Sequence, residues 1–288
     1  MNTPSIPPFT LCMRGQILSL ETPKIMGILN ITKDSFYDGG LFHELDSAFQ
    51  QVEHMIGEGA DIIDIGATST RSGSPISNPD DEIKALLPII NFITKNHPQK
   101  YISIDTYHHS VAEAALESGA HLINDISGGL YDPKIFETTA QYKAPIILMH
   151  IQGTPETMQV QPNYKNLIQE VMLQLAQQTE KAIEAGIQDI IIDPGFGFGK
   201  TITHNFSLFQ QLENFSIFKR PLLVGISRKS MIWKTLQTSA EQALTGTIAL
   251  NMLALEKGAH ILRVHDVKAA KETIAIYNAL HQRPISTN

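Results

Sequence analysis

The chain has 288 residues, of which 42% are hydrophobic and 18% charged, and its formal net charge at pH 7 is -7. It is long enough for one large core, and its negative charge argues against non-specific binding to nucleic acid. The only cysteine, Cys12, rules out an internal disulfide and favours a reducing, cytoplasmic location. We expect neither a signal peptide nor a membrane-spanning segment.

Residues 1–23 predict a small β-hairpin that closes the bottom of the fold, with extended pieces at Phe9–Met13 and Gln16–Leu20. Short apolar runs then alternate with patterns that have apolar residues three and four positions apart, as buried strands and amphipathic helices do. We expect eight strands, at Lys24–Asn30, Asp61–Gly66, Tyr101–Asp105, His121–Ile126, Pro145–His150, Asp189–Asp193, Pro221–Ser227 and Ala259–His265. Residues 24–282 form the predicted single domain, and residues 283–288 a loose tail.

Two of the predicted helices carry more specific expectations. The helix at about residues 164–185 should have a buried face made of Ile168, Val171, Met172, Leu175 and Ile183. Pro88 should kink the helix that contains it, or lie near its first turn.

A repeated pattern supports one fold class. Four times, a glycine ends a helix-like segment, a small or apolar residue follows, and a buried strand begins; these glycines are Gly59, Gly119, Gly186 and Gly258. Eight strands that alternate with helices in one α/β domain predict a (β/α)8 TIM barrel with an N-terminal hairpin. An open doubly wound sheet is the alternative, but no Gly-x-Gly-x-x-Gly follows the first strand.

The segment DIIIDPGFGFGK at residues 189–200 contains a possible nucleotide-binding loop. A P-loop requires a glycine five residues before its Gly-Lys-Thr, and Pro194 stands at that position. We therefore interpret the segment as a buried strand that ends at Asp193 and opens into a glycine-rich turn.

Polar side chains follow every predicted strand. They are Asn30, Thr70, Arg71, Asp105, Asn124, Asp125, His150, Asp193, Ser227, Arg228, Lys229, Arg263 and His265. Because a TIM barrel places its active site at the C-terminal ends of its strands, we expect these groups to meet there. Carboxylates, an amide and a lysine suit a flat heterocycle with several donors and acceptors, whereas arginine, histidine and asparagine suit a polyanion with a divalent metal.

Eight motifs along the chain together resemble those of the dihydropteroate synthase family. They are MGILNITKDSF at 26–36, DIGATSTRSG at 64–73, SIDT at 103–106, INDISGG at 123–129, LMHIQGTPETM at 148–158, DPGFGFGK at 193–200, GISRKSM at 225–231 and RVHD at 263–266. The resemblance covers about Lys24 to Asn278. It implies a TIM barrel, a homodimer and a Mg2+-dependent transferase that joins 4-aminobenzoate to a dihydropterin carrying a methyl diphosphate, with release of diphosphate.

The resemblance also implies roles for individual residues. The catalytic residues would be Asp105, Asp193, Lys229, Arg263 and His265. The pterin diphosphate would contact Thr70, Asp105, Asn124, Asp193, Lys229, Arg263 and His265. The 4-aminobenzoate would contact Arg71, Phe198, Ser227 and Lys229, and Asn30 would bind the metal.

The chain departs from the family pattern in two long loops that we expect to close over the second substrate. Lys33 stands where the family usually has proline, Thr68 where many members have glutamate, and Ser72 where proline is usual. The pterin residues match the pattern.

Three other functions use the same features. A methyltransferase that binds methyltetrahydrofolate would share the barrel and the Asp–Asn–Asp set, but it has no diphosphate to bind. A barrel metallohydrolase needs clustered histidines, often a His-x-His at the first strand, where this chain has Asn30. A non-catalytic pterin-binding protein is the third.

Overall fold

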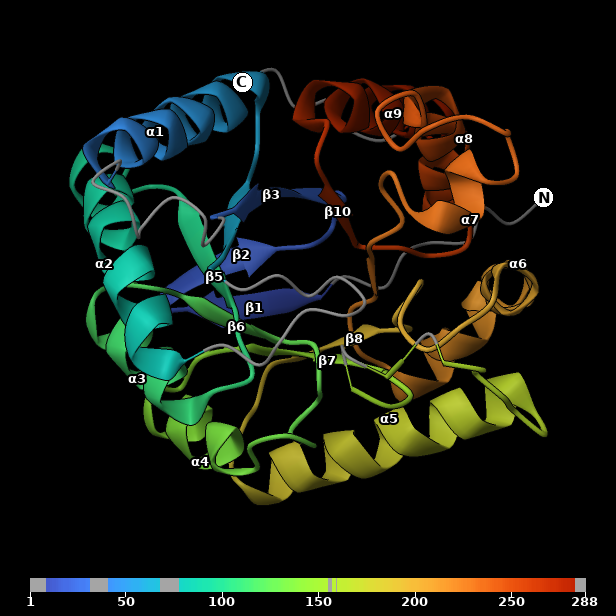
Figure 1. The fold of residues 1–288 in the computed structure, drawn as a ribbon, viewed down its shortest axis with the longest axis horizontal. Coiled ribbons are helices and arrows are strands. Elements are labelled where there is room, and N and C mark those ends of the chain that lie inside the picture. The colour runs from blue at the N-terminus through green and yellow to red at the C-terminus, as the bar shows by residue number, and fades with distance from the viewer. Residues whose placement is uncertain (1–8, 32–40, 68–77, 155–156, 159, 283–288) are drawn as a thin grey trace.

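The computed structural model describes residues 9–31, 41–67, 78–154, 157–158 and 160–282. Eight parallel strands form one sheet in the order β8-β7-β6-β5-β4-β3-β10-β9. A parallel bridge between Ile192 and Leu222 joins the two edge strands, so the sheet closes into a barrel. Figure 1 shows the strands as a ring with the helices outside it. The predicted TIM barrel is therefore confirmed, and the open sheet is not.

The strands are short and buried at almost every position. They are β3 (Lys24–Asn30), β4 (Ile62–Gly66), β5 (Tyr101–Asp105), β6 (Leu122–Asp125), β7 (Ile146–Met149), β8 (Ile190–Asp193), β9 (Leu223–Val224) and β10 (Ile261–Val264). Burial on both faces explains why these segments are apolar runs and not alternating patterns.

The helices alternate with the strands along the chain. They are α1 (Leu41–Glu58), α2 (Pro79–Asn96), α3 (His109–Glu117), α4 (Lys134–Gln141), α5 (Leu167–Glu184), α6 (Ile202–Gln210), α7 (Ser230–Trp233), α8 (Leu244–Glu256) and α9 (Val267–Leu280), with a 3-10 helix, η2 (Leu212–Phe218), after α6. The four repeated glycines have φ between 93° and 115°, which confirms that each ends its helix in a left-handed conformation. Among the described residues, no helix combines the length and apolar character needed to cross a membrane.

The N-terminal hairpin fills one end of the barrel. Strands β1 (Thr10–Met13) and β2 (Gln16–Ser19) pair antiparallel, and Figure 1 shows them crossing the middle of the ring. Leu11, Met13, Leu18 and Leu20 are buried, and they pack against the inward-facing residues Met26, Ile62, Leu122, Ile147, Ile191, Leu223 and Ile261. The Cys12 amide also donates a 2.7 Å hydrogen bond to Asp189, just before β8. The hairpin thus closes the N-terminal ends of the strands, as the sequence predicted.

One predicted helix detail is wrong, and for Pro88 one of the two predicted alternatives is excluded. Pro88 lies well inside α2, away from its first turn, and the helix continues past it with Ile89 and Ile90 buried. Ile183 is 49% exposed, whereas Ala182 beside it is buried. Helix α5 buries only a narrow stripe at Val171, Leu175, Gln178 and Ala182, so a large residue one position beyond the stripe remains in solvent.

We predict that Met13→Ala lowers the free energy of unfolding by about 2–5 kcal/mol, because it leaves a cavity in the hairpin's contact with the barrel. Ile17, on the same hairpin, is 72% exposed, so Ile17→Ala should change the free energy by no more than about 0.5 kcal/mol. Urea denaturation of both variants measures the difference. Equal effects would show that the hairpin does not depend on its buried face.

Candidate active site

The C-terminal ends of the strands bring the polar side chains together. The parallel register places Asp105 beside Asn124 on adjacent strands, and Met149 beside Asp193. Asp105, Asn124 and Asp193 are each at most 6% exposed. Burying two carboxylates in one place is unfavourable unless cations and hydrogen-bond donors compensate for them.

The main compensation comes from Arg263 on β10. Its Nε donates a 2.7 Å hydrogen bond to Asp64, and its Nη2 donates a 2.5 Å hydrogen bond to Asp105. Asp64 also accepts hydrogen bonds from Ser103 Oγ at 2.5 Å and from Asn124 Nδ2 at 3.1 Å. One guanidinium therefore connects β10 to β4 and β5 across the barrel.

Asp64 is a site residue that the sequence-based assignment missed. It is fully buried in the middle of β4, and it holds Arg263 and Asn124 in place. The signal was present, because a charged residue inside the apolar run DIIDIG needs a buried partner. Its partner is 199 residues away in sequence, so the run alone did not identify it.

Asp105 has one oxygen that is not satisfied. Its Oδ2 pairs with Arg263, but its Oδ1 is buried and has no hydrogen-bond partner within the described ranges. Burial raises the pKa of the Asp105 carboxyl above its ordinary value, although the charge of Arg263 opposes this effect. A buried acceptor without a partner indicates that a ligand with an N–H or O–H donor completes the site.

Asp193 and Lys229 form the second part of the site. Asp193 Oδ1 accepts a 2.8 Å hydrogen bond from the Gly195 amide. Burial raises the pKa of the Asp193 carboxyl, and the charge of Lys229 opposes the shift. Burial lowers the pKa of Lys229 to about 8. Its ammonium donates to the carbonyl of Phe196 and lies 4.5 Å from the centre of the Phe198 ring. Lys229 thus links Asp193 to an aromatic surface.

The glycine-rich turn after β8 is held by a buried lysine. Lys200 is 2% exposed, and its ammonium contacts the carbonyls of Gly195 at 2.8 Å and Phe198 at 3.1 Å, and Nδ1 of His150 at 2.8 Å. Burial lowers the pKa of His150 to about 2, so this imidazole is neutral and accepts the hydrogen bond. Lys200 therefore holds the turn in place through the turn's own carbonyls. Its ammonium is used for these contacts and is not free to bind a nucleotide phosphate, which agrees with the exclusion of a P-loop.

His265 and Ser227 lie on the other side of Arg263. His265 Nδ1 lies 3.1 Å from Ser227 Oγ, and the His265 amide also donates to Ser227 Oγ at 3.2 Å. Burial lowers the pKa of His265 to about 4, and the charge of Arg263 acts in the same direction. The imidazole is therefore neutral near pH 7 before any ligand binds.

A cavity of about 770 Å³ begins at this histidine. It extends between α1, α8 and α9, and its lining includes Asn30, Arg228, His265 and Asp266. The Asn30 amide oxygen lies 3.7 Å from the point where a Cβ on Gly66 would stand, close to the end of β4. Arg228 forms a two-point ion pair with Asp266, so much of its charge is already compensated. Asn30 and His265 thus line the same cavity.

Some predicted residues play a structural part or lie outside the described ranges. Asp125 accepts hydrogen bonds from the amides of Ser127 and Gly129, so it forms the turn after β6. Thr70, Arg71, Lys33, Thr68 and Ser72 fall outside the described residues. In the described part of the chain, no three histidine, cysteine, aspartate or glutamate side chains are grouped so that they could hold a metal.

Comparison with known proteins agrees with this geometry. The pterin-binding enzyme family matches residues 26–265. The chain belongs to the pterin-binding enzymes. Dihydropteroate synthase of Escherichia coli strain K12 is 41% identical to it over 271 residues, which are 93% of this chain and 95% of that one.

Solved structures of pterin-binding enzymes show the same fold. Yersinia pestis dihydropteroate synthase, solved with a sulfonamide drug, has a TM-score of 0.89 and 39% identity, and the match covers 95% of this chain and all of that one. Xanthomonas albilineans dihydropteroate synthase, solved with 4-aminobenzoic acid, has a TM-score of 0.88 and 35% identity, and covers 96% of this chain and all of that one. The family suggested by the eight motifs is therefore confirmed.

We predict that Gly195→Ala abolishes pterin binding. A Cβ at this position would stand 1.9 Å from the carbonyl oxygen of His150, and the φ of 71° adds strain for any side chain, so the turn beside Asp193 has to move. Gly15 is the matched control, since its φ is 83° but a Cβ there meets nothing within 4 Å. Gly15→Ala should lower stability by about 1–2 kcal/mol and leave pterin affinity unchanged. Calorimetric titration with a pterin tests both, and unchanged affinity in Gly195→Ala would contradict the prediction.

Proposed function

We propose that this chain is a dihydropteroate synthase that condenses (7,8-dihydropterin-6-yl)methyl diphosphate with 4-aminobenzoate, releasing diphosphate, in folate biosynthesis. Its 41% identity to the Escherichia coli enzyme over 93% of the chain supports this function. The observation in the structure that carries the proposal is the unpartnered Oδ1 of Asp105, beside Asn124, with Asp193 also buried at the end of its strand. These are buried acceptors, and the amino-pyrimidine edge of a pterin is rich in N–H donors.

Each group at the strand ends has a role in holding the pterin. Asp193 has one oxygen bound to the Gly195 amide, so the other is available for a pterin N–H. Asp105 Oδ1 would take a second donor, and Asn124 can both donate and accept. Lys229 can donate to an oxygen or ring nitrogen, and it lies over Phe198, which offers an apolar surface for an aromatic ring. These contacts would fix the plane of the heterocycle.

We place the diphosphate between Asn30 and His265. Both residues line the same cavity. Arg263 lies on the last barrel strand and His265 directly after it, where this fold commonly binds phosphate. Mg2+ commonly binds through one or two protein oxygens together with substrate phosphates and water, so a single amide oxygen from Asn30 fits it. The metal, when bound, would neutralise charge on the leaving diphosphate.

The second substrate would approach from the side of Phe198, Ser227 and Lys229. Ser227 lies shortly after β9, and its Oγ is beside His265. The carboxylate of 4-aminobenzoate would accept a hydrogen bond from this part of the site. Arg71 stays a predicted contact. The Yersinia pestis relative was solved with a sulfonamide drug, and we infer that sulfonamides compete for this second site in the present chain too.

The reaction can be derived from the charges. As the C–O bond to the diphosphate breaks, electrons leave with the diphosphate and positive charge develops on the methylene carbon and the pterin ring. The carboxylates of Asp105 and Asp193 stabilise that positive charge, while Arg263 and His265 stabilise the departing anion. The amine of 4-aminobenzoate then forms the new C–N bond and releases one proton to solvent. Because diphosphate is a good leaving group once neutralised, no general acid is required.

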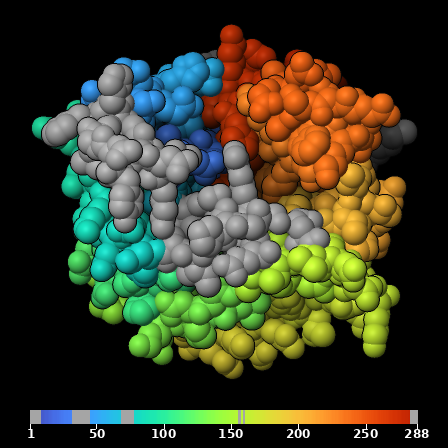
Figure 2. Space-filling model, viewed as in Figure 1, coloured from blue at the N-terminus to red at the C-terminus, as the bar shows by residue number. Residues whose placement is uncertain are grey.

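We also propose that two copies associate through α8. This helix is rich in apolar residues, and Leu244, Ile248 and Leu253 are exposed on it. Figure 2 shows the orange part of the chain, which includes α8, at the outer surface of the molecule. An exposed apolar helix face is typical of a surface that meets a partner. A cytoplasmic location, suggested by the single cysteine, stays a prediction.

The first test concerns the pterin. Asp193→Asn should weaken pterin binding by about ten- to a hundredfold, because an NH2 group would replace the oxygen that accepts pterin N–H donors. It should also abolish diphosphate release that requires both substrates. Asp132→Asn, at a partly buried carboxylate that binds His109, is the control and should change neither. Calorimetry and a diphosphate-release assay measure the two effects; pterin-dependent turnover in Asp193→Asn would refute the assignment.

The second test separates the diphosphate from the pterin. His265→Ala should weaken the diphosphate substrate by about tenfold or more and leave the affinity for hydroxymethyl-dihydropterin nearly unchanged. His265 is the better choice here, because Arg263 also holds Asp105 and its loss would disturb both ligands. Equal losses for the two ligands, measured by calorimetric titration, would argue against an anion site at His265.

The third test concerns association. Leu253→Glu should place a charge on the exposed part of α8, at a residue that does not line the cavity beside His265, and convert dimers to monomers in sedimentation velocity. Ile276→Glu, on the exposed side of α9, is the control and should leave the mass unchanged. A monomeric unmodified protein at micromolar concentration would refute the proposed interface.

A further inference from the structure

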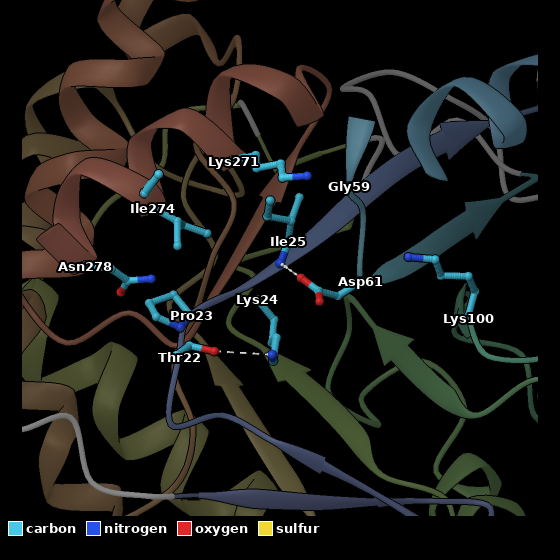
Figure 3. Close-up of a pocket in the computed structure, with 11 residues that line it drawn as sticks. Thr22, Pro23, Lys24, Ile25, Gly59, Asp61, Lys100, Lys271, Ile274 and Asn278 are labelled. Carbon is cyan, nitrogen blue, oxygen red and sulfur yellow. Dashed lines mark hydrogen bonds between the residues drawn. The ribbon is translucent and has the colours of Figure 1, made fainter. Parts of the chain in front are cut away.

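A second pocket opens at the opposite end of the barrel from the active site. It has a volume of about 220 Å³ and lies where β3 begins, before the first residues of β4 and β5 and against the C-terminal half of α9. Figure 3 shows its lining, with Pro23, Ile25 and Ile274 as apolar surface. No residue assigned to the proposed reaction contributes to it.

The pocket carries an excess of positive charge. Three lysines and one aspartate line it, a formal charge of +2: Lys24, Lys100 and Lys271 surround Asp61. Lys24 donates to the hydroxyl of Thr22, and Lys100 donates to the carbonyl of Ala60, so both form hydrogen bonds with neutral oxygens. Lys271 lies across Gly59, where a Cβ would come within 2.9 Å of its ammonium. Three lysines, from β3, from the residue before β5 and from α9, thus line one small pocket.

Two acceptors complete the pocket, the buried Asn278 and the partly buried Asp61. Asn278 is 3% exposed, and its Oδ1 is buried without a hydrogen-bond partner in the described structure. Figure 3 shows its amide turned toward Pro23. Asp61 Oδ2 accepts a 2.9 Å hydrogen bond from the Ile25 amide, and no described residue donates to its Oδ1. Burial raises the pKa of Asp61, while the three lysines oppose the shift. A buried acceptor without a partner needs a donor from a ligand or water.

We propose that this pocket binds a small phosphomonoester that also carries hydroxyl groups. The three lysines match the negative charge of a phosphate, and the oxygens of Asp61 and Asn278 match hydroxyl donors next to it. The volume is below the range for drug-sized ligands, so a compact molecule fits best. Neither group alone would match the set, because a bare anion offers no donors to the acceptors and a neutral polyol offers no negative charge to the lysines.

The experiment uses methyl NMR of the full chain, with isoleucine methyl groups as local reporters. Ile25 and Ile274 report on this pocket, and Ile126, directly after β6, reports on the active site. Titration with glycerol 3-phosphate should shift Ile25 and Ile274 in a saturable way, whereas glycerol should not shift them. Inorganic phosphate should bind about tenfold more weakly, because it lacks the hydroxyl groups.

Variants identify the residues responsible. Lys24→Gln and Lys271→Gln should each weaken glycerol 3-phosphate binding by about tenfold, the loss of one charge-assisted hydrogen bond, and leave dihydropteroate formation unchanged. Lys181 is exposed on α5, outside the pocket lining, and Lys181→Gln should have no effect. Shifts at Ile126 without shifts at Ile25 and Ile274 would overturn the proposal, as would equal binding to unmodified protein and both lysine variants. Equal affinity for inorganic phosphate would overturn the role of Asp61 and Asn278.

Discussion

The ion pairs of Arg263 with Asp64 and Asp105 determine how the rest of the site is arranged. The arginine extends from β10 across the barrel to β4 and β5, and it compensates two buried carboxylates with one cation. Two carboxylates and one cation leave a net negative charge, which favours a ligand that supplies donors or develops positive charge. The pair therefore prepares the site for a substrate whose ring becomes positive as its leaving group departs.

The turn after β8 contributes geometry more than charge. Lys200 holds its carbonyls from below and Lys229 holds the carbonyl of Phe196 from the side of the ligand. Lys200 lies at the end of the turn itself and Lys229 directly before α7, so two separate segments hold the turn. Asp193 and Phe198 lie on that turn or at its start, and their positions depend on both contacts. Such fixed positioning is what a site that binds a flat ring requires.

The two ends of the barrel have different chemistry. At the C-terminal ends of the strands, buried carboxylates are balanced by arginine and lysine around a space for an aromatic ring. At the N-terminal ends, the hairpin closes the interior, and three lysines outside it surround one aspartate. Because the barrel's packed interior separates the two ends, each can bind its own ligand.

The sequence by itself determined the barrel, the closing hairpin and the family, because these depend on local patterns: apolar runs, helix-ending glycines and motifs beside strand ends. It also identified Asp105, Asn124, Asp193, Lys229, Arg263 and His265 as neighbours, since parallel strands end on one side of the sheet.

Only the tertiary structure decided how they pair. The partner of Arg263 at Asp64 is far away in sequence, Arg228 is compensated by Asp266, and His265 is neutral because it is buried beside a cation. The tertiary structure also left Ile183 exposed to solvent and buried Lys200. Pairing, burial and protonation depend on the three-dimensional neighbours of a side chain, and no pattern of residues along the chain specifies them.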